Sequence, residues 1–175
     1  MYGNQYYLKN TGQFGSGSTL DINVEPIWSI TNGNGNIAVA IVDTGVDLSH
    51  EDLAGTLLQG YTVGNPTGYG APQLWTEQDK AHGTACAGIV GAIDNEVGVK
   101  GVASGVKLLP VNIVPNKASG NYNGFATNFQ IATAIRWAYQ RTDILSCSWG
   151  GGSPSNDIAS AIREARTNGR NGKGT

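Results

Sequence analysis

The sequence predicts an α/β fold: a parallel sheet with helices on both faces. Segments of strand length alternate along the chain with segments of helical periodicity, and strands separated by helices pair in parallel. The first of these strands, Ile37–Val42, is apolar without a break, which is typical of a strand covered on both faces. Glycine accounts for 26 of the 175 residues, which predicts many tight turns and close backbone approaches.

The expected elements divide the chain into an arm and a domain. Residues 1–36 lack a strong periodicity and are expected to form an N-terminal arm, with one short helix near Glu25–Trp28, packed on a domain formed by residues 37–175. In the domain the sequence predicts, in order, strands at Ile37–Val42 and Leu57–Val63, a loop at Asn65–Gln73, a helix from His82 to about Ile93, a strand at Val106–Val114, a helix at 128–141, a strand at Asp143–Cys147, and a helix at Asn156–Thr167 that Gly169 ends.

Composition and charge exclude several classes of function. A net charge of -2 at pH 7 argues against a surface for nucleic acid or for an anionic membrane. No apolar run approaches the roughly 20 residues of a membrane helix, so no membrane segment is expected. No basic and apolar signal peptide is recognised at the start. The two cysteines, Cys86 and Cys147, are expected to be free buried thiols, with a disulfide or a shared metal as the alternatives.

Three polar features fall where predicted strands or helices begin or end. Asp43 follows the buried strand, His82 opens a helix rich in small residues, and Ser148-Trp149-Gly150 follows a later strand. Ligands of parallel sheets bind beyond the carboxyl ends of the strands, so these residues are expected to share a crevice. A carboxylate that orients an imidazole, and an imidazole that accepts a proton, are what acyl transfer uses to activate a serine.

Each of these residues also has a purely structural interpretation. A lone Asp after a strand is commonly a turn or cap residue, and His82 alone is compatible with a satisfied buried histidine. Asp43-Thr44-Gly45 also spells the triplet of aspartic proteases, but that mechanism needs two carboxylates and the triplet occurs once.

Two further patterns are interpreted as structural. His50 lies in a polar turn, and a zinc site built from His50, Glu51 and Asp52 lacks convincing ligand spacing. The segment 169–175 resembles a phosphate-binding loop, but Gly174 separates the lysine from the threonine that such a loop needs next to it.

Four segments together resemble the subtilisin-like serine proteases, the subtilases. They are Ile41-Val-Asp-Thr-Gly-Val-Asp-Leu-Ser-His-Glu-Asp-Leu53, His82-Gly-Thr-Ala-Cys-Ala-Gly88, Asp94-Asn-Glu-Val-Gly-Val-Lys-Gly-Val-Ala103 and Ser146-Cys-Ser-Trp-Gly-Gly151. Cys86, the Ser146–Gly150 segment and Gln5-Tyr-Tyr-Leu-Lys-Asn-Thr-Gly12 lean toward the kexin branch or its bacterial relatives.

The resemblance implies a role for each matching residue. Asp43 would accept a hydrogen bond from His82, and His82 would act as general base and then as general acid. Ser148, Trp149 and Gly150 would offer backbone groups to an extended peptide or protein substrate and line the primary specificity pocket. A second substrate-pairing segment is expected within 118–124. Kexins prefer basic residues in their substrates and bind them with acidic side chains just after the Ser-Trp-Gly segment. In this chain the first acidic residue after that segment is Asp157, so the resemblance does not imply a preference for basic residues.

The loop after the histidine helix also resembles the high-affinity calcium site of the family. Calcium takes about six to eight oxygen ligands. The resemblance implies five of them: the side chains of Asp52 and Asn95 and the carbonyls of Ile93, Val97 and Val99. Gln13 or Asp21 is considered for a sixth, and a plain turn containing asparagine is the alternative.

The chain departs from the family in one respect. The nucleophilic serine and the oxyanion asparagine have no counterpart in the 175 residues, because Ser146 and Ser148 fall in the substrate-binding segment and Ser153 and Ser155 in a loop. The sequence is therefore expected to be the amino-terminal part of a serine endopeptidase, with the rest in missing sequence or in a second polypeptide. The alternative is a truncated, non-catalytic peptide-binding or assembly module. The family implies an extracellular or periplasmic location.

Overall fold

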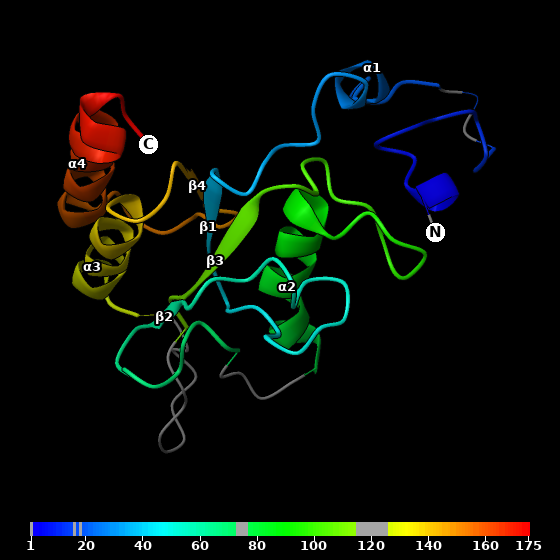
Figure 1. Ribbon diagram of the computed structural model, residues 1–175. Helices are drawn as coiled ribbons and strands as arrows, with labels where there is room; N and C mark the ends of the chain where they lie inside the picture. Colours follow the sequence, from blue (N-terminus) through cyan, green and yellow to red (C-terminus); the bar gives the residue numbers. More distant parts are fainter. Residues whose placement is uncertain (1, 16, 18, 73–76, 115–125) are drawn as a thin grey trace.

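The sheet of this protein is parallel, with strands in the order β2-β3-β1-β4 (Figure 1). The computed structural model describes residues 2–15, 17, 19–72, 77–114 and 126–175, with only the backbone for residues 77–80. Within that part the strands are β1 (Ala38–Asp43), β2 (Tyr61–Thr62), β3 (Lys107–Asn112) and β4 (Ile144–Ser146). The helices are η1 (Tyr2–Asn4), α1 (Glu25–Trp28), α2 (Glu77–Gly91), α3 (Asn128–Tyr139) and α4 (Asn156–Gly172).

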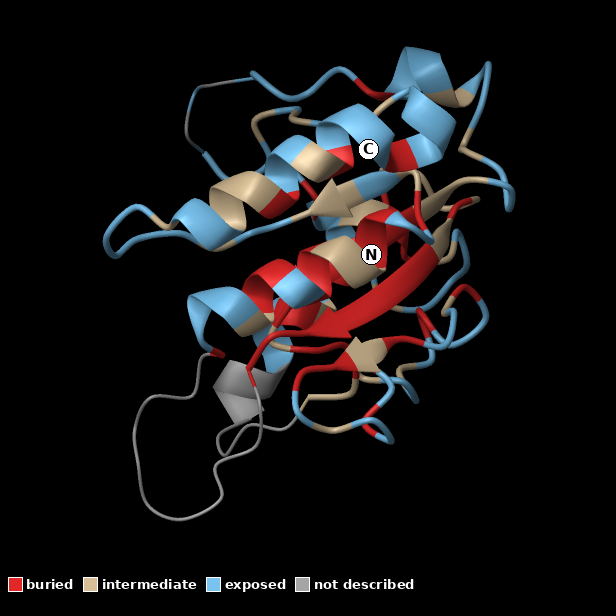
Figure 2. Ribbon diagram, turned by 90° about the vertical axis from the view of Figure 1, so that its left-hand side faces the viewer, coloured by how far each residue is buried: buried red, intermediate tan, exposed pale blue. Residues whose placement is uncertain are grey.

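Helices cover both faces of the sheet, as the sequence predicts (Figure 1). Ala40 and Val42 of β1 belong to the core that includes α3, while Val39 and Ile41 belong to the core that includes α2. Alternate side chains of a strand point to opposite faces, so both faces of β1 are buried, and burial extends along β3 (Figure 2). This double burial explains why the strand is apolar without a break.

The second strand is shorter than the sequence predicts. Only Tyr61–Thr62 of the expected 57–63 segment forms a strand, with an isolated bridge between Leu57 and Leu108. The reason lies in β3: the amide of Leu108 donates to the carbonyl of Thr56 and its carbonyl accepts from the amide of Leu58, but Pro110, two residues on, has no N–H to donate. The ladder is therefore interrupted at its middle.

Two helix boundaries refine the sequence prediction. α2 begins at Glu77, so His82 lies inside the helix and does not open it; the polar residues before His82 carry no apolar pattern but have good helix propensity. The expected stop at Gly169 is confirmed, because Gly169, Arg170 and Asn171 have non-helical dihedral angles inside the segment assigned to α4. None of the helices in the described ranges is both long and apolar enough to cross a membrane.

Candidate active site

Asp43 and His82 meet at the carboxyl end of β1. The Nδ1 atom of His82 lies 2.7 Å from Oδ1 of Asp43. The Asp43 side chain is 2% exposed and also accepts a hydrogen bond from the backbone amide of Thr44 at 2.7 Å, whereas the His82 side chain is 53% exposed. A buried carboxylate thus holds one nitrogen of an imidazole whose ring is open to solvent.

Glycine and threonine let α2 approach β1 closely enough for this contact. A Cβ on Gly83 would collide with the carbonyl oxygen of Gly45, so only glycine fits there. The backbone amide of Gly83 donates to the hydroxyl of Thr44, and the amide of Asp47 donates to the hydroxyl of Thr84, both at 3.0 Å. The small residues of this helix therefore position His82 against Asp43, which is the close packing that the composition predicts.

The segment after β4 lies beside the same end of the sheet. β4 pairs with β1 in parallel, with Ser146 opposite Ile41. The indole N–H of Trp149 donates to the carbonyl of Val42 at 2.7 Å, and the ring packs against the α3 side of the core. The Trp149 side chain therefore fastens the segment to β1, a role that local sequence did not indicate. Gly150 is exposed, and a Cβ there would meet open space.

Cys86 adds a thiol to the Asp43 and His82 pair. It lies one helical turn after His82, with its Sγ 3.9 Å from Nδ1 of His82. Burial raises the pKa of this thiol, and a hydrogen bond with Ser148 offsets part of the rise. Both cysteines are free, but Cys86 is only half-buried and Cys147 is exposed, so the expectation of two buried thiols was wrong in its burial. Cys86 is on α2 and packs only at the margin of the α2 core, and Cys147 directly follows β4, which lies at the end of the strand order.

Asp52 is buried against the loop that follows α2. The amide of Val99 donates to its Oδ2 at 2.8 Å, and the amide of Ile93 donates to its carbonyl at 3.0 Å. The Asp52 side chain is 1% exposed, and its other oxygen, Oδ1, is buried without a hydrogen-bond partner in the described part of the chain. A buried carboxylate oxygen with no donor is costly unless a cation satisfies it.

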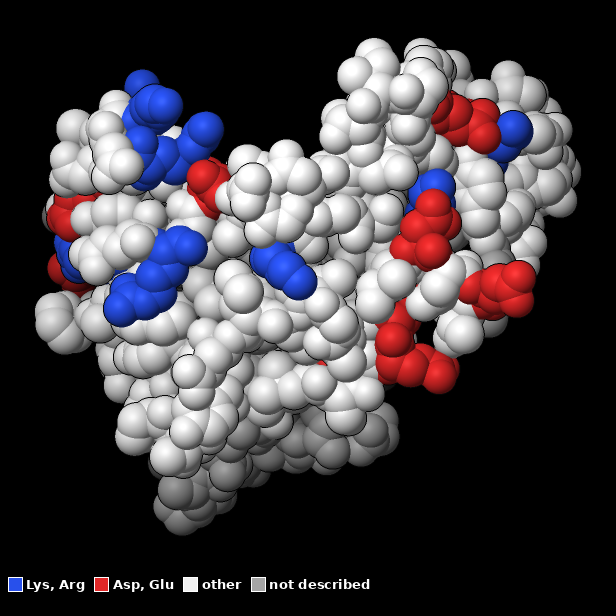
Figure 3. Space-filling view, viewed as in Figure 1, with Lys and Arg blue, Asp and Glu red and all other residues white. Residues whose placement is uncertain are grey.

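Other residues of this loop also leave room for a cation beside Asp52. Gly98 has a φ of +58°, and a Cβ there would collide with the Asp52 carboxylate. Asn95 accepts a hydrogen bond from the amide of Val97 at 2.8 Å and keeps a second lone pair free for a ligand. Asp52, Gly98 and Val99 line an open pocket of about 800 Å³. On the face shown in Figure 3, acidic side chains gather on the α2 and arm side, whereas most basic ones lie over α3 and α4.

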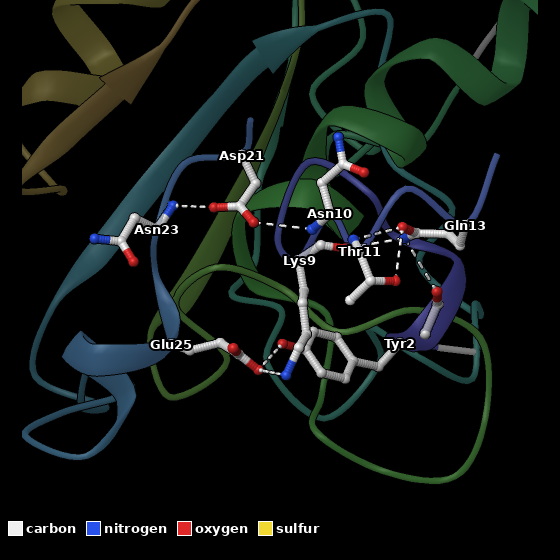
Figure 4. A network of polar contacts seen from close by, with 9 residues as sticks. Tyr2, Lys9, Asn10, Thr11, Gln13, Asp21, Asn23 and Glu25 are labelled. Carbon is white, nitrogen blue, oxygen red and sulfur yellow. Dashed lines mark hydrogen bonds and ion pairs between the residues drawn. The ribbon is translucent and has the colours of Figure 1, made fainter. Parts of the chain in front are cut away.

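The arm residues considered for a sixth ligand lie elsewhere. Asp21 accepts from the backbone amides of Asn10 and Asn23, and Gln13 bonds to Thr11 and to backbone carbonyls, all within the arm (Figure 4). Their oxygens are thus engaged in a local network.

Gln5 is instead an arm side chain that hydrogen-bonds to the loop. It is 5% exposed, accepts from the amide of Lys100 at 2.8 Å and donates to the carbonyl of Lys100 at 2.9 Å. The two residues are 95 positions apart, so no local pattern identifies the pair.

His50 has the structural role that the sequence indicates. Its Nδ1 accepts a hydrogen bond from the amide of Asp52 at 3.2 Å, and its own amide donates to the carbonyl of Asp47. It thus organises the turn that presents Asp52. The expected second substrate-pairing segment, 118–124, lies outside the described residues.

A buried carboxylate bonded to an exposed imidazole, at the carboxyl ends of parallel strands, is the orienting and basic half of a site that activates a nucleophile. Comparison with known proteins agrees: residues 34–175 match the subtilase family. The chain belongs to the subtilase family. Its resemblance to the kexin branch and to bacterial relatives is also confirmed by the proteins it matches.

Three relatives illustrate this. Neuroendocrine convertase 2 of Caenorhabditis elegans is 33% identical over 185 residues, covering 100% of this chain and 27% of that protein. The calcium-dependent protease of Trichormus variabilis is 36% identical over 149 residues, covering 83% of this chain and 20% of that protein. The crystal structure of fervidolysin from Fervidobacterium pennivorans matches with a TM-score of 0.64 and 32% identity, over 78% of this chain and 20% of that one. The chain thus spans about a fifth to a quarter of the length of these proteins.

Proposed function

We propose that this chain is the amino-terminal part of a serine endopeptidase of the subtilisin type. In this proposal Asp43 and His82 activate a serine supplied by sequence outside the 175 residues, either further along the same polypeptide or in a second one. The observation that carries the proposal is the 2.7 Å contact between His82 Nδ1 and Asp43 Oδ1 at the carboxyl end of β1. Membership of the subtilase family supports it.

The geometry assigns separate tasks to the two ring nitrogens of His82. With its proton on Nδ1 and donated to Asp43, the neutral imidazole presents Nε2 as a base. Nε2 would take the serine proton during attack on the peptide carbonyl and later give it to the leaving amine. Asp43, held by Thr44 and buried, keeps this tautomer and stabilises the imidazolium.

The substrate proposed is an extended peptide or a protein. Ser148, Trp149 and Gly150 would pair their backbone with it, in the manner of an added strand. Because the Trp149 indole is tied to Val42, this segment is held in register with the strand that carries Asp43. The exposed Gly150 leaves the backbone there accessible to a ligand.

The loop after α2 is proposed as a structural calcium site. Asp52 and Asn95 would contribute side-chain oxygens, and Ile93, Val97 and Val99 would contribute carbonyls. The unpartnered Oδ1 of Asp52 and the glycine at position 98 fit such an ion. When bound, Ca²⁺ would supply the positive charge that this buried carboxylate lacks. A relative named calcium-dependent protease supports the assignment. We further propose an extracellular or periplasmic location, from the family alone.

A serine-directed fluorophosphonate probe tests the catalytic assignment. The purified protein is treated with the probe, denatured and analysed by intact mass spectrometry, with a His82→Ala sample as the control. A labelled polypeptide, whether longer than this chain or copurified with it, and loss of the label in His82→Ala would support the proposal. A single unlabelled species near 18.2 kDa would favour a non-catalytic peptide-binding module.

A further inference from the structure

We propose that Asn112 is a positioning residue for the Asp43 and His82 pair, acting through loop 68–72, which it holds against the backbone that follows Asp43. The inference rests on the proposed function, because this pair is the one proposed to activate a serine. It concerns an asparagine at the end of β3 to which no sequence motif assigned a role.

Three neighbouring strands of the sheet end on a buried polar side chain. Thr62 ends β2, Asn112 ends β3 and Asp43 ends β1, and the sheet register pairs Thr62 with Asn112 and Asn112 with Asp43. These residues are 1%, 0% and 2% exposed, respectively. A buried polar group costs free energy unless it is hydrogen-bonded, so the partners of these side chains show what the row holds in place.

The Asn112 side-chain amide binds two backbone groups. Its Nδ2 donates to the carbonyl of Ala71 at 2.7 Å, and its Oδ1 accepts from the amide of Val114 at 2.7 Å. A carbonyl can only accept and a backbone amide can only donate, so these two partners fix the orientation of the side chain. A carboxylate would lose the bond to Ala71, and an apolar side chain would lose both bonds. Asn112 thus fastens Ala71 to the end of β3.

Thr62 fastens the same loop to β2. Its hydroxyl oxygen accepts from the amide of Gly70 at 3.0 Å. Loop 68–72 is therefore tied down at two consecutive residues, Gly70 by Thr62 and Ala71 by Asn112. Both side chains are buried, so these hydrogen bonds form in a low dielectric environment and make the loop rigid.

The loop in turn holds the backbone that follows β1. The carbonyl of Gly70 accepts from the amide of Val46 at 2.9 Å. Gly45 has a φ of +98°, and a Cβ there would lie only 2.8 Å from the carbonyl oxygen of Ala71, the oxygen that Asn112 binds. The loop and this backbone therefore pack closely at the atom that Asn112 fixes.

Gly45 also lies against α2. A Cβ on Gly83 would collide with the carbonyl oxygen of Gly45 and would lie 3.2 Å from the Cβ of Asp43. The backbone after β1 is thus packed between the loop and the helix. Close packing transmits displacements, so loss of the Asn112 hydrogen bonds would move this backbone. The 2.7 Å contact between Nδ1 of His82 and Oδ1 of Asp43 would change with it.

Substrate binding should be less affected than turnover. The proposed substrate segment follows β4, which lies on the opposite side of β1 from β3 in the strand order, and Trp149 ties it to Val42. A misplacement of about 1 Å in a catalytic site can cost about 10²-fold in rate. Asn112→Ala in the assembled peptidase should therefore lower kcat by about 10²-fold and leave KM nearly unchanged.

Proton nuclear magnetic resonance of the purified protein tests the positioning without an activity measurement. The Nδ1 proton that His82 donates to Asp43 should give a resonance far downfield, which His82→Ala identifies by removing it. Asn112→Ala should broaden this resonance beyond detection, because a loosened contact lets the proton exchange with water. Thr142→Ala is the matched control. It removes the bond from a buried hydroxyl to the carbonyl of Ala138, before the amino end of β4, and should keep the resonance sharp.

Far-ultraviolet circular dichroism shows whether each variant is folded. If Asn112→Ala does not fold, Thr62→Val replaces it as the test variant, since it removes the bond to Gly70 with little change in shape and should broaden the same resonance. A folded test variant that keeps the wild-type resonance would overturn the inference. An equal loss in Thr142→Ala would also overturn it, because it would indicate general destabilisation.

The outcomes separate this inference from the proposed function. A resonance that depends on Asn112, in a protein that no fluorophosphonate labels, would leave the positioning standing while the peptidase function failed. Conversely, a labelled peptidase in which Asn112→Ala keeps both the resonance and kcat would contradict the positioning alone.

Discussion

Two regions of the molecule differ in what holds their side chains in place. One is the carboxyl end of β1, where Asp43 contacts His82 of α2, and the other is the loop that follows α2. At the carboxyl end of β1, the two side chains project from a buried strand and from a helix packed on it, and Nδ1 of His82 contacts Oδ1 of Asp43 directly. In the loop, Asp52 is held by backbone amides from turns, and one of its oxygens has no partner among the described residues. Each carboxylate thus has one oxygen without a partner in the described part of the chain, but Asp43 is held by a side chain from a helix and Asp52 by the backbone of a loop.

The loop that follows α2 is also tied to the arm, residues 1–36, by contacts between segments far apart in the chain. The backbone amide of Lys100 donates to the Gln5 side chain and its carbonyl accepts from it. The Lys100 ammonium lies 4.0 Å from the ring centroid of Trp28 and 2.9 Å from Asp94. The indole of Trp28 donates to the carbonyl of Val102 at 2.8 Å. Within the arm, Glu25 joins Tyr2 and Lys9 (Figure 4). In this protein a strand and a helix thus hold the Asp43 and His82 side chains, whereas a loop fixed by long-range contacts holds Asp52, where we propose that an ion binds.

Among the predicted effects, the largest is expected for substitution of His82, which lies beside Asp43. His82→Ala in the assembled peptidase should lower kcat by about 10⁴-fold or more without loss of the fold, because the base is removed while the surrounding packing remains. The size of this loss in kcat is set by analogy with subtilisin, a member of this family, in which removal of a triad residue lowers kcat by at least this much. Peptide hydrolysis under saturating substrate measures it. His50→Ala, which changes the other histidine, should retain activity; comparable losses in both variants would contradict the assignment.

Calcium removal should act on stability and not on the catalytic contact. At free Ca²⁺ about 100 times the dissociation constant, the ion should add roughly 2.7 kcal/mol to the free energy of unfolding. Asp52→Asn should lose most of that increment, because the amide gives up the carboxylate charge. Denaturant unfolding with and without a chelator measures it. Glu51→Gln removes the neighbouring exposed carboxylate and should keep the full response; an equal loss there would indicate a general charge effect.

Gln5→Ala should test the link between the arm and the loop. The substitution leaves the amide and carbonyl of Lys100 without their buried partner, at a cost of about 1 to 3 kcal/mol in the free energy of unfolding. Limited proteolysis should then cut the arm faster. Gln13→Ala, whose amide bonds only within the arm, should have a smaller effect on both measurements. If the two variants were equal, the loop would not depend on the arm through Gln5.

The smallest expected effect separates two glycines with similar backbone angles. Gly98 and Gly64 have φ of +58° and +71°, so alanine at either position should cost about 1 kcal/mol of backbone strain. Only at Gly98 would the new methyl group press on Asp52, since a Cβ on Gly64 meets open space. Gly98→Ala should therefore also weaken calcium binding, measured by titration calorimetry, and Gly64→Ala should not. Equal calcium affinities would place the ion away from Asp52.

Local sequence patterns predicted most of the elements because their causes are local. The apolar run Ile37–Val42 became β1 nearly residue for residue, and the helical spacing of Ile131, Ile135 and Ala138 became the buried face of α3. Burial on both faces of a strand leaves an unbroken apolar run, and burial along one side of a helix leaves a helical period. Both patterns can be read from neighbouring residues. The placement of Asp43 at a strand end followed from the same reasoning.

Contacts between distant segments left no such pattern. The missing amide of Pro110 shortened β2, which lies about 50 positions earlier in the chain. The bond from Trp149 to Val42 joins residues 107 positions apart, and the pairing of Gln5 with Lys100 spans 95. Nothing in the neighbourhood of Gln5 distinguishes it from Gln13, and it was Gln13, with Asp21, that the sequence analysis considered as a ligand at the loop.

The sequence by itself determined the family, the order of the elements and the kinds of chemical group available: a carboxylate at the end of a buried strand, a histidine in a helix of small residues and two free thiols. Only the tertiary structure decided which of these atoms touch, which oxygen is left without a partner and which arm residue reaches the loop. The physical reason is that secondary structure is set by neighbours in the chain, whereas a site is set by the packing of elements whose approach depends on every side chain between them.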